Sequence, residues 1–132
     1  MLLKNGTLVN GEKKDIFILD GKIEEIADYI SVTKAKEIIR IKKNRELDIL
    51  DLEDRYIMPG IIDVHTHMRD PGVTEKEDLE TGSAACAKGG ITTFADMPNT
   101  NPATITQEAL ELKREIAKEK CIVNYGFHFG GS

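Results

Sequence analysis

The sequence predicts an α/β fold that follows a short β-rich part, and three observations support this prediction. From Pro59-Gly60 onward, three short apolar runs alternate with two stretches of helical spacing, which is typical of parallel strands joined by helices. Before this dipeptide, two glycine-containing turns separate segments with strand character. The composition, 40% hydrophobic and 31% charged, is that of a globular protein. We therefore divide the chain into residues 1–58 and residues 59–132.

The beginning of the chain is predicted to be a β-meander. Asn10-Gly11 and Asp20-Gly21 interrupt the strand-like segments, and both dipeptides suit the positive φ angles of a type I′ hairpin turn. Residues 33–47 follow with a high density of charge and several isoleucines embedded among the charged side chains. We predict an exposed, partly strand-like excursion for this segment.

The remaining elements are predicted from apolar runs and from helix-start signals. Further strands are expected over residues 48–52, 61–65, 91–97 and 121–129. Thr74 with Glu77, and Thr104 with Gln107, have the spacing of capping boxes, so a helix is predicted after each. Gly89-Gly90 suits the end of the first helix, because glycine tolerates the left-handed conformation there. The predicted buried helix faces are Leu79, Ser83, Cys86 and Ala87 in the first helix and Ala109, Leu112 and Ile116 in the second.

The charge and the apolar segments exclude several classes of partner. The net charge of −5 gives no electrostatic footprint for nucleic acid or for an anionic membrane. No apolar stretch approaches the ~20 residues that a membrane span needs, and the first residues lack the pattern of a signal peptide. Cys86 and Cys121 lie far apart in apolar surroundings, which predicts two free buried thiols and a cytoplasmic location.

A histidine pair stands at the end of the first predicted parallel strand. His65 and His67 are two residues apart, so on an extended strand their side chains point the same way, and Arg69 continues this parity. Two neutral imidazoles at one point are suitable zinc ligands. The tripeptide alone also occurs by chance, as a pair of exposed or hydrogen-bonded histidines. Its position at the carboxyl end of a strand in a βα series favours a metal site, because barrel enzymes place their chemistry there.

The segments around this pair resemble the dihydroorotases of the amidohydrolase superfamily. PGIIDVHTHMRDPG is similar to the opening motif of the superfamily, and DMPNTNP is similar to the dihydroorotase form of the loop after the second strand. KEDLETGSAACAKGGITT between them fits the same family. The resemblance is strongest from Pro59 to Pro102. It implies a (β/α)8 barrel, of which residues 59–132 hold the first two βα units and the third strand, preceded by part of a small β-sandwich over residues 1–58.

The resemblance also implies a reaction. It implies that His65 and His67 bind one or two zinc ions in an enzyme that reversibly hydrolyses dihydroorotate to N-carbamoyl-L-aspartate in pyrimidine biosynthesis. It implies that Arg69 and Asn99 bind the substrate carboxylate, for which the planar guanidinium of arginine is well suited. From the residues alone, Arg69 could instead pair with Asp70, and Asn99 could be an ordinary turn residue.

Relatives of this family share the histidine pair, so the pair does not identify the substrate. Allantoinases resemble this stretch but usually lack the arginine and the asparagine, and hydantoinases depart further across both motifs. Dihydroorotate is therefore the expected substrate. The alternatives are another cyclic amidohydrolase, of the allantoinase or hydantoinase type, and a non-catalytic scaffold that resembles dihydroorotase.

Four other polar side chains receive structural predictions. Asp63 precedes the histidine pair and is expected to hold the strand end rather than a metal. Asp78 and Asp96 are expected to start a helix or to form salt bridges. His128 lies near the end of the third predicted parallel strand, and the family resemblance gives no metal ligand at that position, so we predict that it is not a ligand.

The length of the chain bounds what it can contain. A (β/α)8 barrel takes ~250 residues, whereas residues 61–132 provide room for two βα units and a third strand. We therefore expect the catalytic aspartate and the other metal ligands to lie beyond Ser132, and no catalytic residue within this chain. The expectation is an N-terminal fragment that is inactive by itself. Its expected partners are the small-molecule substrate and either further copies or another pyrimidine-pathway enzyme.

Overall fold

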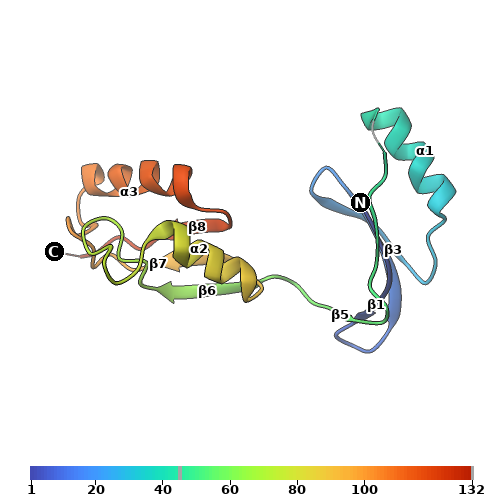
Figure 1. Ribbon diagram of the computed structural model, residues 1–132, viewed down its shortest axis with the longest axis horizontal. Helices are drawn as coiled ribbons and strands as arrows, with labels where there is room; N and C mark the ends of the chain where they lie inside the picture. The colour runs from blue at the N-terminus through green and yellow to red at the C-terminus, as the bar shows by residue number, and fades with distance from the viewer. Residues whose placement is uncertain (45, 132) are drawn as a thin grey trace. The chain divides into compact units, whose positions relative to one another are not determined.

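The computed structural model describes residues 1–44 and 46–131 (Figure 1). It divides into two compact units, Met1–Pro59 and Gly60–Ser132. Arg45 falls within the excursion predicted for residues 33–47, and Ser132 falls within the predicted second part, but both residues lie outside the described part. Each unit is built on a sheet of its own.

The first unit is a five-stranded sheet with the order β3-β2-β1-β4, and β5 pairs with β1 as well. The strands β1, β2 and β3 pair in antiparallel fashion, which confirms the predicted meander, whereas β4 and β5 run parallel to β1. The short β4 lies inside the strand predicted for residues 48–52. The bounds are β1 Leu2–Leu8, β2 Lys13–Leu19, β3 Lys22–Ala27, β4 Ile49–Asp51 and β5 Tyr56–Ile57.

The two predicted hairpin turns have different outcomes. Asp20 and Gly21 have φ angles of 53° and 71°, so both central residues are left-handed and the type I′ prediction is confirmed. At Asn10-Gly11 only the glycine is left-handed, with a φ of 87°, and its N–H donates to the Leu8 carbonyl at 2.8 Å. The type I′ prediction is wrong there. A longer loop that ends in a left-handed glycine joins the strands instead.

The charged segment after the meander is a helix. The helix α1 (Val32–Lys43) begins at the N-cap Ser31, whose side chain accepts a hydrogen bond from the N–H of Lys34. Ala35 and Ile39 are buried on one face because they are four residues apart. The predicted strand-like excursion is therefore wrong. The isoleucines embedded among the charged side chains are consistent with a helix as well, and burial follows the spacing of a helix.

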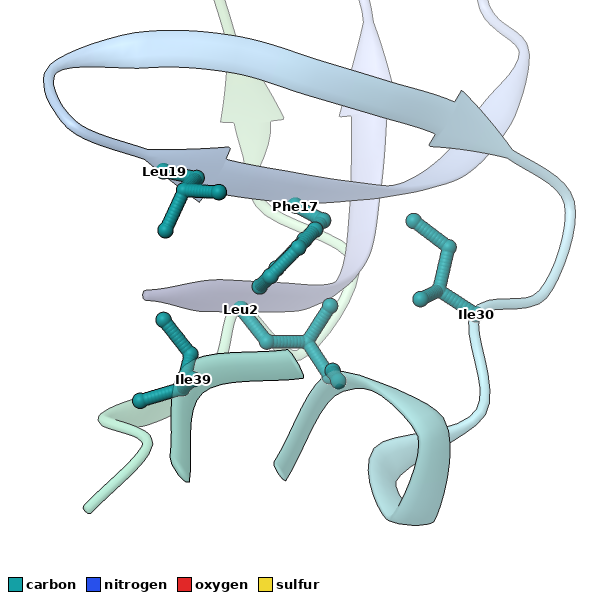
Figure 2. Packing of buried hydrophobic residues seen from close by; sticks show 6 residues of the cluster. Leu2, Phe17, Leu19, Ile30 and Ile39 are labelled. Carbon is teal, nitrogen blue, oxygen red and sulfur yellow. The ribbon is translucent and has the colours of Figure 1, made fainter. Parts of the chain in front are cut away.

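The core of the first unit lies between the sheet and α1. Figure 2 shows Phe17 and Leu19 of β2 pointing toward Leu2 of β1 and Ile39 of α1, and Ile30 closes the cluster at its edge. All five side chains are buried. The alternation of β2 places its apolar residues on the face that the helix covers, and burial of that face against α1 stabilises both elements.

The second unit is a three-stranded parallel sheet with the order β6-β7-β8. The helices α2 and α3 connect consecutive strands and lie on one side of the sheet (Figure 1). This arrangement confirms the predicted α/β class. The bounds are β6 Ile61–Thr66, α2 Leu79–Lys88, β7 Ile91–Asp96, α3 Gln107–Lys120 and β8 Asn124–Phe127.

Both helices begin later than the capping boxes predicted. Asp78 is the N-cap of α2, and its carboxylate accepts a 2.8 Å hydrogen bond from the N–H of Thr81. This confirms the helix-start role expected for Asp78. Thr106 is the N-cap of α3 and accepts from the N–H of Ala109 at 3.2 Å. The capping boxes at Thr74 and Thr104 are therefore wrong, because a competent cap lies closer to each helix.

The buried faces of the helices differ from the predictions at single positions. In α2, Leu79, Ser83 and Cys86 are buried as predicted, whereas Ala87 is exposed. In α3, Ala109 is buried as predicted, but Leu112 is 45% exposed and Ile116 is half-buried. The residues on the buried stripe of α3 are Ala109, Lys113 and Ala117. The stripe follows a spacing of four residues, so a lysine takes the place predicted for a leucine.

The core of the second unit joins α2 and α3 to the sheet. Its buried members are Met68, Leu79, Cys86, Phe94 and Ala117. Cys86 and Cys121 are both free thiols, as predicted, but Cys121 is only half-buried. Burial raises the pKa of both thiols, and for Cys121 it raises the pKa to about 11. In the described part of the chain, neither the length nor the apolarity of any helix is sufficient for crossing a membrane.

Candidate metal centre

The carboxyl end of β6 departs from a regular strand. Asp63 pairs with Phe94 and Thr66 with Asp96, so β6 holds one residue more than β7 over this interval. The Asp63 carboxylate accepts a hydrogen bond from the N–H of His65 at 3.0 Å. Asp63 thus holds the strand end, as its position before the histidine pair suggested.

The two histidines of the motif lie side by side. The ring centroids of His65 and His67 are 5.3 Å apart with an interplanar angle of 63°, and both side chains are exposed. Spacing by two residues therefore brings the imidazoles together even though the strand is irregular between Asp63 and Thr66, an interval that contains His65. Two neighbouring imidazoles open to solvent have the chemistry of a partial zinc site.

His67 is held by a residue from the loop after β7. Its Nδ1 atom lies 2.9 Å from the Oδ1 atom of Asn99. An amide oxygen can only accept, so the proton of this hydrogen bond is on Nδ1. In the neutral ring, the Nε2 atom of His67 then carries the lone pair that a metal needs. A neutral imidazole fixed through its other nitrogen is the usual state of a metal-binding histidine, so the residues present fit zinc.

Arg69 lies on a loop rather than on the strand. The strand β6 ends at Thr66, and Arg69 has a φ of 61°, so the expected strand parity does not extend to it. Its side chain is half-buried, and its carbonyl accepts from the N–H of Val73 at 3.0 Å. The left-handed backbone at Arg69 turns the chain immediately after the histidine pair.

The neighbouring Asp70 is engaged elsewhere. Its carboxylate is buried and accepts a 2.7 Å hydrogen bond from the ammonium group of Lys120 on α3. This hydrogen bond raises the pKa of Lys120. Within residues 1–44 and 46–131, the ion pairs of Asp70 include Lys120 and do not include Arg69. The guanidinium of Arg69 is therefore not held by its neighbour.

The loops after β6 and β7 are docked to each other. The N–H of Asn101 donates to the Pro71 carbonyl at 3.0 Å. Gly72 has a φ of 92°, and a Cβ atom at this position would lie 2.0 Å from the Asn101 carbonyl oxygen. The close approach of the two backbones therefore requires glycine. This backbone contact holds the segment that follows Arg69 against the segment that follows Asn99.

The sequence did not reveal the buried ion pair below the histidines. Asp96 and Lys113 have side chains with no exposed surface, and the Lys113 Nζ atom lies 2.6 Å from the Asp96 Oδ2 atom. A salt bridge was one of the roles expected for Asp96, but Lys113 was not singled out. Its spacing of four residues from Ala109 and from Ala117 is the signal that could have found it, because a lysine on a buried stripe needs an acidic partner.

His128 is hydrogen-bonded within the protein. Its Nε2 atom lies 2.8 Å from the carbonyl oxygen of Val64. Across the described ranges, 1–44 and 46–131, no group of three or more His, Cys, Asp or Glu side chains is placed to hold a metal ion. The pair of His65 and His67 is thus the candidate centre that these residues offer.

Comparison with known proteins identifies the family. Residues 54–128 match the sequence model of a family described as "Dihydro-orotase-like". The chain belongs to this dihydroorotase-like family. It is 42% identical over 131 residues to a dihydroorotase of Methanosphaera stadtmanae, covering 98% of this chain and 28% of that protein. It is 39% identical over 127 residues to a dihydroorotase of Bacillus anthracis, covering 93% of this chain and 27% of that protein. The chain therefore spans about 28% of the length of these curated relatives.

The dihydroorotase-like chain also resembles solved structures of cyclic amidohydrolases. It matches the L-hydantoinase (dihydropyrimidinase) from Arthrobacter aurescens with a TM-score of 0.80 and 29% sequence identity. The match covers 98% of this chain and 27% of that structure. Sequence and structure therefore agree on a mixed α/β chain of the cyclic amidohydrolase family.

Proposed function

We propose that this chain supplies two metal ligands and two substrate-binding side chains to a zinc-dependent dihydroorotase. The reaction would be the reversible hydrolysis of dihydroorotate to N-carbamoyl-L-aspartate, a step of pyrimidine biosynthesis. The observation that carries the proposal is the meeting of His65, His67 and Asn99 at the ends of β6 and β7. Membership of the dihydroorotase-like family supports the choice of reaction.

The proposed architecture is the beginning of a (β/α)8 barrel. The parallel order β6-β7-β8, with helices between consecutive strands, is that of two βα units and a third strand. The similarity to the L-hydantoinase structure supports this proposal. We propose that the first unit, Met1–Pro59, contributes to a small β-sandwich. The two free thiols are consistent with a proposed cytoplasmic location.

His65 and His67 are the residues that would hold zinc. A bound zinc ion supplies Lewis-acid polarisation of a carbonyl and a lowered pKa of water. The task of the protein is to keep both imidazoles neutral and directed to one point. Asn99 contributes by accepting the Nδ1 proton of His67, which leaves Nε2 of His67 as the electron-pair donor.

Arg69 and Asn99 are proposed to bind the carboxylate of the substrate. The Arg69 guanidinium can donate two parallel hydrogen bonds to a carboxylate, and its own neighbour Asp70 is paired with Lys120 instead. Asn99 uses its oxygen on His67, and within residues 1–44 and 46–131 its amide N–H groups donate to no other group, so they can donate to an anion. One asparagine would thus join the metal site to the substrate site.

The 132-residue chain is proposed to be inactive without the rest of such an enzyme. It spans about 28% of the length of its dihydroorotase relatives, and it offers two histidines at the candidate centre. The remaining ligands and the catalytic aspartate are proposed to come from other segments of the whole protein. Zinc-dependent turnover of dihydroorotate by the purified 132-residue chain would contradict this part of the proposal.

The substrate assignment can be tested in a complete dihydroorotase-like enzyme that includes this sequence. Arg69→Ala should lower kcat/KM for dihydroorotate by about 100-fold, because two charge-assisted hydrogen bonds to the carboxylate are lost. Bound zinc, measured by atomic emission, should stay unchanged. Arg114→Ala removes an exposed arginine paired with Glu111 and should leave the kinetics unchanged. Full dihydroorotate turnover in both Arg69→Ala and Asn99→Ala would remove the assignment.

The L-hydantoinase match favours one second candidate, a hydantoin-type cyclic amide. Hydantoin lacks the carboxylate of dihydroorotate, so a hydantoinase would not depend on the guanidinium of Arg69. Turnover of hydantoin that exceeds turnover of dihydroorotate, and that survives Arg69→Ala, would support the second candidate. Absence of zinc-dependent turnover of either ring would favour a non-catalytic scaffold.

A further inference from the structure

The carboxylate of Asp96 lies directly beneath the histidine motif. The Asp96 Oδ1 atom accepts a hydrogen bond of 2.7 Å from the main-chain N–H of Met68. The Thr66 hydroxyl lies 3.4 Å from the same oxygen and 3.2 Å from the Ala95 carbonyl oxygen, so its one proton is shared between these two acceptors. Thr66 and Met68 are the two neighbours of His67 in the sequence. The Asp96 carboxylate therefore holds the main chain directly after that histidine, and it makes a longer, shared contact directly before it.

Lys113 is the ionic partner of this carboxylate in the interior. Its ammonium group lies 2.6 Å from Asp96 Oδ2 and donates a 3.0 Å hydrogen bond to the Met97 carbonyl. The ring centroid of Phe127 lies 5.1 Å from the same ammonium group. The ammonium group carries three N–H donors, so it can donate to the Met97 carbonyl and still lie against Asp96 Oδ2. The buried ion pair leaves Oδ1 entirely to the segment around His67.

The main chain of Asp96 and Met97 connects the ends of all three strands. The Asp96 carbonyl accepts from the N–H of His128 at 2.9 Å, beyond the end of β8. The N–H of Met97 donates to the Thr66 carbonyl at 2.9 Å, at the end of β6. The backbone around Asp96 thus fixes the strand ends, and its side chain fixes the turn that follows His67. Asp96 thus acts on His67 through the residues on either side of it and not through the imidazole ring.

We propose that Asp96 is a positioning residue for His67, with Lys113 as its obligatory counter-ion. The pair fixes the main-chain path through residues 66–68 and so fixes where the His67 imidazole is presented. The consequence for metal binding rests on the zinc site proposed above, whereas the fixed path of the backbone does not. Lys113 reaches the site from α3, so that helix is part of the machinery that builds the metal centre.

The test compares two double variants that both remove the buried charges. Asp96→Asn with Lys113→Met keeps an oxygen that can accept from the N–H of Met68. Asp96→Leu with Lys113→Met has a similar shape but no acceptor. Changing both partners together avoids an unpaired buried charge, which would unfold the protein for another reason. Thr106→Ala, which removes the N-cap of α3, is the control for a general loss of stability.

The first measurement does not involve metal. Backbone NMR of the 132-residue chain should show the Met68 amide shifted downfield and protected from solvent exchange in the unchanged chain, in the asparagine double variant and in Thr106→Ala. The leucine double variant should lose both properties. Equal protection in the two double variants would overturn the proposal. If the leucine variant fails to fold, the asparagine variant still decides, because loss of Met68 protection there would show that the acceptor is not what matters.

The second measurement is the zinc affinity of the histidine pair, by competition with a chromogenic chelator. We expect the leucine double variant to bind zinc about tenfold more weakly, the usual effect of losing a group that orients a ligand. The asparagine variant and Thr106→Ala should stay within about threefold of the unchanged chain. Equal zinc affinity in the two double variants would overturn the link to His67. Protection of Met68 as expected, without zinc binding that requires His65 and His67, would support the positioning role and overturn the metal site.

Discussion

The Nδ1 atom of His67 lies 2.9 Å from the Oδ1 atom of Asn99, although 32 positions separate these residues in the sequence. The contact joins the loop after β6 to the loop after β7. The two ends of the Asn99 amide therefore have different roles. Its oxygen accepts from the imidazole, and its N–H groups point to no other partner within residues 1–44 and 46–131 and can donate to an anion. The metal and substrate parts of the proposed site therefore share one side chain.

Replacing Asn99 by alanine should weaken zinc binding without unfolding the chain. The Nδ1 proton of His67 loses its acceptor, so the ring is free to rotate and to change tautomer. We expect about a tenfold loss of zinc affinity by isothermal titration calorimetry of the 132-residue chain. Asn101→Ala is the matched control, because the hydrogen bond of Asn101 to Pro71 comes from its main chain. Identical affinities in the two variants would contradict an orienting role for Asn99.

The sequence predicted best what depends on near neighbours. The proximity of His65 and His67 follows from their spacing, and the Asp20-Gly21 turn follows from two residues that accept positive φ angles. The same local pattern was misleading for residues 33–47, where adjacent isoleucines suggested a strand. There, the buried pair of Ala35 and Ile39 follows helical spacing against a sheet that the segment itself does not reveal.

The features missed by the sequence depend on partners far along the chain. Lys113 is buried because its ammonium group pairs with the carboxylate of Asp96, which comes from a different element. The general tendency of leucine to be buried favoured Leu112 for the buried face of α3, but Leu112 is 45% exposed. The site was likewise predicted in part. The family resemblance singled out Asn99 as a substrate ligand, but its contact with His67 depends on how two loops dock.

Gly72→Ala should destabilise the second unit strongly. The new methyl group would meet the Asn101 carbonyl oxygen at 2.0 Å, and the φ of 92° is unfavourable for alanine. Gly90→Ala is the matched control, since Gly90 has a φ of 81° with no atom within 4 Å of an added Cβ. We expect a loss of about 1–2 kcal/mol for Gly90→Ala, from the backbone alone, and a clearly larger loss for Gly72→Ala. Urea unfolding followed by circular dichroism measures the free energy of unfolding of both variants. Equal losses would show that the contact between Gly72 and Asn101 contributes little to stability.

Asp15 should make the first unit sensitive to acid. Burial alone would raise the pKa of its carboxyl, but hydrogen bonds from the Lys4 ammonium and from the N–H groups of Ile30 and Asn5 outweigh burial and lower the pKa below 3.8. Above that value the carboxylate is charged in the folded and unfolded states, and its full contribution to stability is present. As the pH falls below about 4, the unfolded chain binds a proton first, so stability decreases until the folded carboxyl is protonated as well.

The Asp15→Asn variant isolates this contribution. It should lose roughly 1–3 kcal/mol of stability at neutral pH, because the ion pair with Lys4 and the charged acceptor are removed. It should also lose the part of the acid dependence that Asp15 causes. Asp28→Asn is the control, since Asp28 is an exposed carboxylate that pairs with Lys14 at the surface. Parallel stability curves for Asp15→Asn and the unchanged chain between pH 5 and pH 3 would contradict the assignment.

The two cysteines should resist alkylation in the folded chain. Burial raises the pKa of the Cys121 thiol from 9.0 to about 11, so at pH 8 the reactive thiolate is roughly a hundredfold rarer than in the unfolded chain. Cys86 is buried, and its thiol pKa is raised for the same reason. Mass spectrometry after brief treatment with iodoacetamide should therefore find both cysteines unmodified in the folded protein and both modified in urea. Fast labelling of Cys121 alone, in a chain whose Cys86 stays protected, would show that the edge of the sheet beside α3 opens locally.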